Sequence, residues 1–128
     1  MNHPKTVAIV DDDMRLLESL RELLESVGYE VLTYPSGRHL VRSDGVARMD
    51  CLITDIGMPR LDGFALERLV GERRPEVPVF LITGRHELAE GRVVGDGMGH
   101  RIFRKPFDGQ ALLTAIDKAL NNAERGNG

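Results

Sequence analysis

Short, mainly apolar runs rich in β-branched residues recur along the 128 residues and alternate with stretches that carry helical signals. Such runs are typical of strands buried on both faces, and we expect strands at 6–10, 29–33, 51–54, 79–82 and 101–104. Alternating strands and helices imply right-handed crossovers and a parallel sheet with helices on both sides. The pattern therefore predicts a single doubly wound α/β domain.

Capping residues mark the predicted helices. Leucines at helical spacing follow Asp13, a plausible N-cap, and stop at Gly28. Asp62 opens another helix in the same way. We expect helices at 14–27, 36–42, 63–71 and about 108–120. We assign residues 1–121 to the domain and 122–128 to a frayed tail.

The segment 85–100 departs from this regularity. A helix is due there, but the segment contains Gly91, Gly95, Gly97 and Gly99. Each glycine inside a helix costs roughly 1 kcal/mol relative to alanine. We expect this helix to be short, bent or mobile, and to carry most of any conformational change.

Composition narrows the class of function. The formal net charge of −3 and the pI of about 5.8 argue against a nucleic-acid surface, which needs clustered Lys and Arg. No apolar run approaches the roughly 20 residues that a membrane helix needs. The single cysteine, Cys51, lies in an apolar run and is expected to be a buried, inert thiol. These features predict a cytoplasmic protein without direct nucleic-acid or membrane contact.

Polar residues follow the predicted strands where each strand ends. Asp11 and Asp12 follow the first, Asp55 the third, Thr83 the fourth and Lys105 the fifth. Singly, the acids and Thr83 are ordinary cap or turn residues and Lys105 an ordinary surface charge. Because ligands bind beyond the carboxyl ends of strands in open parallel sheets, the set together predicts one functional site.

Three converging carboxylates would raise one another's pKa unless a cation offset their charge. Hard oxygen ligands with room for water suit Mg²⁺. A carboxylate can attack a phosphoryl group, and Asp55 is the best candidate nucleophile. Lys105 would hold a phosphoryl oxygen through its charge, and the Thr83 hydroxyl would offer another a hydrogen bond.

In order and spacing, these motifs closely resemble the response regulator receiver family of two-component systems, over about residues 5–120. The matching motifs are Val10-Asp11-Asp12, Leu52-Ile53-Thr54-Asp55-Ile56-Gly57-Met58-Pro59 with Asp62-Gly63, Ile82-Thr83-Gly84 and Lys105-Pro106-Phe107. The resemblance implies a flavodoxin-like (βα)5 three-layer sandwich with strand order 2-1-3-4-5. It further implies a cis Lys105–Pro106 bond and a Mg²⁺ site formed by Asp11, Asp12, Asp55 and the Gly57 carbonyl.

The resemblance also implies a function. Asp55 would accept a phosphoryl group from a sensor histidine kinase or phosphotransfer protein, and the domain would signal to a downstream protein target. It would be a regulatory domain that acts enzymatically only on its own phosphorylation state, and a homodimer is left open. In one departure, Ile102 stands where relatives commonly carry Tyr or Phe as part of their switch.

Two other classes of function compete with this hypothesis. An aspartate-nucleophile phosphohydrolase of the haloacid-dehalogenase type typically needs a second acid two positions after its nucleophile, and that position is Gly57. A receiver-like scaffold that is never phosphorylated would lack the acceptor, the acid pair or the lysine, yet all are present. Both alternatives therefore rank below the phosphorylated switch.

Overall fold

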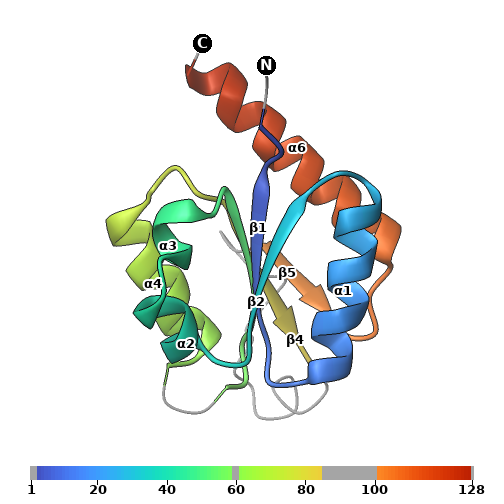
Figure 1. Cartoon of the computed structure of the whole chain (residues 1–128), viewed down its shortest axis with the longest axis vertical. Helices are drawn as coiled ribbons and strands as arrows, with labels where there is room; N and C mark the ends of the chain where they lie inside the picture. Colours follow the sequence, from blue (N-terminus) through green and yellow to red (C-terminus); the bar gives the residue numbers. More distant parts are fainter. Residues whose placement is uncertain (1–2, 59–60, 85–100, 128) are drawn as a thin grey trace.

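The sheet is parallel throughout and has the strand order β2-β1-β3-β4-β5 (Figure 1). The computed structural model describes residues 3–58, 61–84 and 101–127. The strands are β1 (Thr6–Val10), β2 (Glu30–Tyr34), β3 (Cys51–Asp55), β4 (Val79–Thr83) and β5 (Arg101–Arg104). The predicted doubly wound α/β class and strand order are confirmed.

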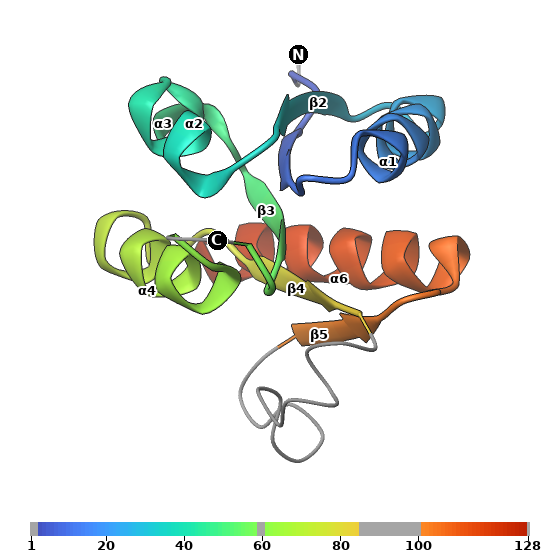
Figure 2. The ribbon, with the colours of Figure 1, turned by 90° about the horizontal axis from the view of Figure 1, so that it is seen from below.

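Helices cover both faces of the sheet, which makes three layers (Figures 1 and 2). α1 and α6 lie on one face, and α2, α3 and α4 lie on the other. Their bounds are α1 (Met14–Ser26), α2 (Gly37–Arg42), α3 (Gly45–Arg48), α4 (Gly63–Arg73) and α6 (Gly109–Asn127). The expected helix between residues 85 and 100 lies outside the described residues.

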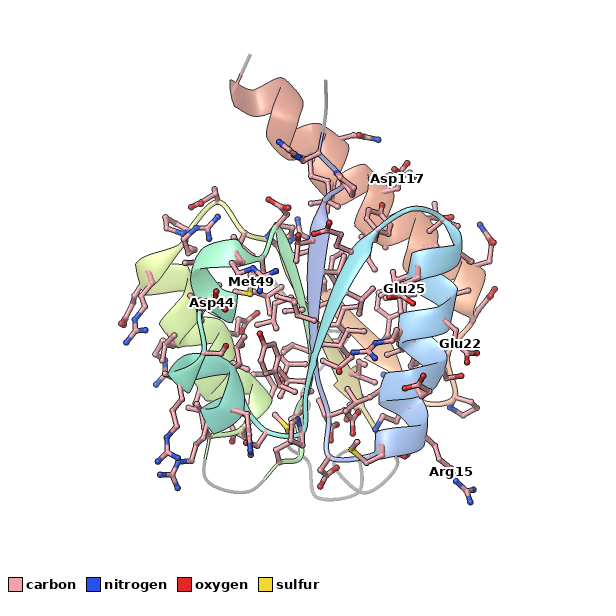
Figure 3. All side chains as sticks on the ribbon, viewed as in Figure 1. Arg15, Glu22, Glu25, Asp44, Met49 and Asp117 are labelled. Carbon is pink, nitrogen blue, oxygen red and sulfur yellow. The ribbon has the colours of Figure 1, made fainter. Side chains whose placement is uncertain are left out.

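Two hydrophobic clusters fill the space between the layers (Figure 3). Val7 and Ile9 of β1 point into the cluster beneath α1 and α6, whereas Ala8 and Val10 point into the cluster beneath α2, α3 and α4. Successive side chains of a strand point to opposite faces, so a strand covered on both sides is apolar at every position. This burial explains the unbroken apolar runs in the sequence.

Several element boundaries differ from their predicted positions. β2 begins one residue later than expected, because the Tyr29 N–H still bonds to the Leu24 carbonyl at the end of α1. The four-residue helix α3 was not predicted, since so short a segment carries almost no periodicity. α6 continues past the expected end at Leu120, so the predicted tail begins inside a helix.

The caps were read correctly. The Asp13 side chain accepts hydrogen bonds from the Arg15 and Leu16 N–H groups, and the Asp62 side chain accepts one from Ala65. Gly28 has φ of 98°, a backbone conformation that favours glycine. Among the described helices, none combines the length and the apolar character needed to cross a membrane.

Candidate functional site

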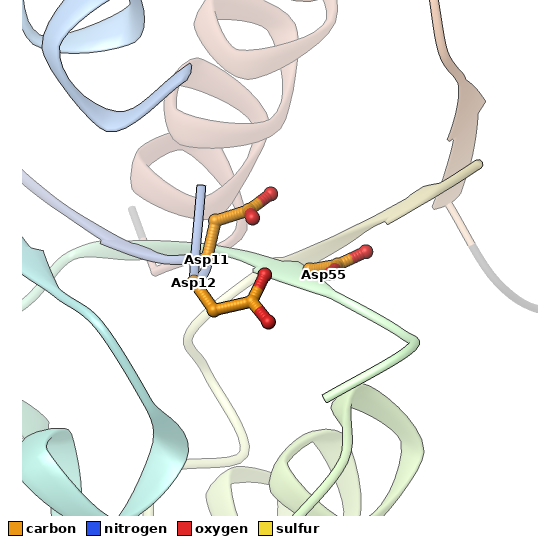
Figure 4. Close-up of side chains that lie close together, drawn as sticks. All are labelled: Asp11, Asp12 and Asp55. Atoms are coloured by element: carbon orange, nitrogen blue, oxygen red, sulfur yellow. The ribbon is translucent and has the colours of Figure 1, made fainter. Parts of the chain in front are cut away.

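Three carboxylates converge at the carboxyl edge of the sheet, as predicted (Figure 4). One oxygen from each of Asp11, Asp12 and Asp55 lies within 4.8 Å of the other two. Asp11 follows β1, and Asp55 is the last residue of the neighbouring β3. Strand order alone therefore brings residues distant in sequence together.

The two neighbouring acids differ sharply in their surroundings. Asp11 is fully buried and Asp12 is exposed. The Asp13 N–H donates to Asp11 Oδ1 at 2.9 Å, while the Asp13 side chain caps α1. Of the three consecutive aspartates, two thus belong to the acidic site and the third begins the helix.

Lys105 supplies the positive charge at this edge. Its Nζ lies 3.2 Å from Asp11 Oδ2 and 3.7 Å from Asp55 Oδ1. The Lys105 backbone N–H donates to the Thr83 carbonyl at 2.8 Å, which ties the start of this loop to the end of β4. The Lys105–Pro106 bond is cis, as the resemblance implied.

Burial raises the pKa of Asp11 above its ordinary value, and the Asp12 charge adds to the rise. The hydrogen bond from the Asp13 N–H and the charge of Lys105 oppose it, yet the pKa stays raised. One ammonium group does not fully offset the carboxylates around it. A further cation would stabilise the ionised cluster, and its closely grouped carboxylate oxygens fit Mg²⁺.

Thr83 and Gly57 lie on the same edge, but their predicted roles are not tested by contacts. Thr83 is fully buried, and its hydroxyl donates to the Gly84 carbonyl at 3.3 Å. It comes one position after Ile82, the residue of β4 in register with Asp55. Gly57 is half-buried two residues after Asp55. The Thr83 contact to a phosphoryl group and the Gly57 carbonyl as a ligand stay predictions.

Gly63 contributes to the site in a way that was not predicted from the sequence. It was interpreted as a turn or cap residue, but a Cβ at this position would lie 2.6 Å from the Asp55 carbonyl oxygen. The Gly63 N–H also donates to the Ile56 carbonyl at 3.2 Å. The first turn of α4 thus packs directly on the backbone of the proposed nucleophile. The Asp62-Gly63 pair was the available signal.

The residue in the switch position is half-buried. Ile102 lies on β5 in register with Leu81 and packs against the cluster beneath α2, α3 and α4. It therefore contributes to the core where relatives commonly have an aromatic ring.

Comparisons with known proteins agree with this geometry. The model of the response regulator receiver domain matches residues 7–117. The chain is 32% identical to the response regulator protein TmoT of Ectopseudomonas mendocina over 96% of its own length and 56% of that protein's. It is 32% identical to the C4-dicarboxylate transport transcriptional regulatory protein DctD of Pseudomonas aeruginosa over 89% of its length and 25% of DctD's. The chain thus spans about half or less of these curated relatives.

A solved structure is similar over almost its whole length. The response regulator receiver domain protein of Clostridium thermocellum superposes with a TM-score of 0.76 at 29% identity, over 94% of this chain and 97% of that one. The likeness in fold therefore extends well beyond the site motifs.

Proposed function

The chain belongs to the response regulator receiver domain family, and from this membership we propose that it is a phosphorylation-dependent switch whose phosphoacceptor is Asp55. The observation that carries the proposal is the position of the Asp55 carboxylate. It lies beside the Asp11 and Asp12 oxygens and 3.7 Å from the Lys105 ammonium. A nucleophilic carboxylate, a group of hard ligands and a cation for the phosphoryl oxygens are thus side by side.

The proposed chemistry is transfer of a phosphoryl group to a carboxylate. An Asp55 carboxylate oxygen attacks the phosphorus of a phosphohistidine, a phosphorus–oxygen bond forms and the phosphorus–nitrogen bond breaks. The imidazole leaves and takes a proton from water. Lys105 pairs with one transferred oxygen, and the Thr83 hydroxyl donates to another. Asp55 then holds an acyl phosphate that changes the charge at the end of β3.

We propose that Asp11, Asp12, Asp55 and the Gly57 carbonyl hold Mg²⁺. When bound, the ion supplies positive charge that offsets the carboxylates and the phosphoryl oxygens. Asp11 and Asp55 contribute ligands from the buried end of the sheet, whereas exposed Asp12 faces the solvent. Lys105 holds the Asp11 carboxylate in place through its 3.2 Å contact.

We infer that the phosphodonor is a sensor histidine kinase or phosphotransfer protein and that the phosphorylated form acts on a downstream protein. The domain would be regulatory, with catalysis confined to its own phosphorylation and dephosphorylation. DctD carries the description of a transcriptional regulatory protein, and this chain matches only 25% of its length. Residues 1–121 would form the receiver unit, and a cytoplasmic setting would suit this chemistry.

The test is intact-mass spectrometry after incubation with acetyl phosphate and Mg²⁺. We expect the wild type to gain one phosphoryl group and Asp55→Asn to gain none. Asp50→Asn is the matched control, since it removes the same charge from the residue before β3, at the other end of the strand. Phosphorylation of Asp55→Asn at the wild-type level would contradict the assignment.

The same measurement separates the competing functions. An unphosphorylated scaffold would gain no mass in the wild type. A phosphohydrolase would turn over many equivalents of a phosphate ester, whereas the proposed switch consumes its donor in step with the decay of its own acyl phosphate.

A further inference from the structure

The two helical layers expose charges of opposite sign. On α1 the exposed acids Glu18, Glu22 and Glu25 face a single exposed base, Arg15, and the N-cap Asp13 is exposed as well. Figure 3 shows Arg15 and Glu22 projecting away from the sheet. Exposed Asp108 and Asp117 extend the negative charge to α6 and the turn before it, against exposed Lys118. This acidic face, formed by α1 and residues 108–118, accounts for the negative net charge of the chain.

The opposite layer is basic at its surface. Its exposed acids are fewer than its exposed bases. The bases on α2, α3 and α4 are Arg38, Arg42, Arg48, Arg68 and Arg73, and the acids in and around these helices are Asp44, Glu72 and Glu76. The sign of the surface charge therefore distinguishes one face of the molecule from the other.

An apolar groove joins the acidic face to the phosphorylation site. Leu16 and Leu23 of α1 form one wall, and Phe107 lies on the other side. The groove encloses about 440 Å³ and reaches Asp13 and Lys105, so Lys105 contributes to both the groove and the acidic site. A protein that brings a phosphoryl group to Asp55 would have a place beside the reacting atoms for an apolar side chain.

We propose, on the basis of the phosphoacceptor role proposed for Asp55, that the acidic face selects protein phosphodonors that carry basic residues around the phosphohistidine and an apolar side chain for the groove. Charges at the rim of an interface act mainly on the rate of encounter and on the choice of partner. Exposed glutamates along α1 attract a basic helix and repel an acidic one, and the effect weakens as salt screens the charges. The groove then fixes the position of the selected donor.

The test uses two synthetic helical peptides, each with one phosphohistidine and one leucine face. They differ only in having lysine or glutamate at the flanking positions. Transfer to the wild-type protein is followed by intact-mass spectrometry at low and high salt, with acetyl phosphate as the reference donor. We expect the lysine peptide to react about tenfold faster at low salt, with a ratio that falls toward one at high salt.

Charge-reversal variants locate the effect. Glu22→Lys should reduce the preference for the lysine peptide severalfold. Glu72→Lys makes the same change at an exposed position of α4 in the other layer and should leave the preference intact. Equal effects of the two variants would assign the preference to net charge and overturn the role of this face.

Other outcomes are equally decisive. Equal or absent transfer from both peptides, with labelling by acetyl phosphate intact, overturns the selection of basic donors. Failure of acetyl phosphate to label Asp55 removes the proposed function itself. Loss of the peptide preference as the protein dimerises in sedimentation experiments would give the face to a second copy of the chain and would also overturn the proposal.

Discussion

The Asp55 carbonyl oxygen lies so close to Gly63 that a Cβ on this glycine would be 2.6 Å from it. The same Cβ would be 2.9 Å from the Cα of Ile56, so both nearest atoms belong to the backbone and cannot turn aside. We expect Gly63→Ala to lower the free energy of unfolding by about 1–3 kcal/mol, the usual cost of overpacking. Urea denaturation followed by circular dichroism measures this loss.

Gly71→Ala is the matched control for this prediction. Gly71 lies on the same helix, is exposed and has no atom within 4 Å of an added Cβ. Alanine favours a helix over glycine by roughly 0.5–1 kcal/mol, so this variant should be more stable than the wild type. If the two alanine variants shift stability alike, the close approach of Gly63 to Asp55 is not the cause.

Asp12→Asn should weaken Mg²⁺ binding by about tenfold or more, because it removes a proposed ligand and its charge. Isothermal titration of the protein with MgCl₂ gives the affinity. Asp13→Asn removes the same charge from the next residue and retains a side-chain oxygen to cap α1. It should change the affinity much less. Similar losses in both variants would mean that local charge, and not ligation by Asp12, determines binding.

Arg74 joins the end of α4 to α3. Its Nη1 donates to the carbonyls of Val46 at 2.8 Å and Ala47 at 2.9 Å. Arg74→Ala should lower the free energy of unfolding by about 1–3 kcal/mol, since hydrogen bonds from a charged donor are lost. Glu76→Gln removes only the exposed partner of Arg74 and should cost clearly less. Chemical denaturation of both variants tests this ranking.

Burial raises the pKa of the Cys51 thiol to about 12 from an ordinary 9.0. At pH 8.5 the folded protein should therefore react with a thiol reagent only through unfolding, while urea-unfolded protein should react at once. Because the folded thiol holds its proton more tightly, stability should fall as pH rises from 9.0 toward 12. Fast labelling of the folded protein would show that Cys51 is accessible.

The sheet and the acidic edge could be predicted because both depend on local patterns. Unbroken apolar runs indicated buried strands, and the residues that follow them had to meet at one edge. The contacts within that edge could not be predicted, since the 3.2 Å approach of Lys105 to Asp11 depends on the path of the loop after β5. Side-chain burial on α1 was also partly wrong. Val27 was assigned to the apolar face but is exposed, and Leu17 is buried in its place.

The alternation of β1 side chains between two separate clusters has a consequence for how substitutions combine. Leu24 of α1 and Leu66 of α4 lie in different clusters, with the sheet between them. Residues that share no neighbours usually contribute independently, so the destabilisations caused by Leu24→Ala and Leu66→Ala should add to within about 0.5 kcal/mol in a double-mutant cycle. One side of the sheet could then accumulate substitutions that suit a new partner while the packing of the other side stays as it is.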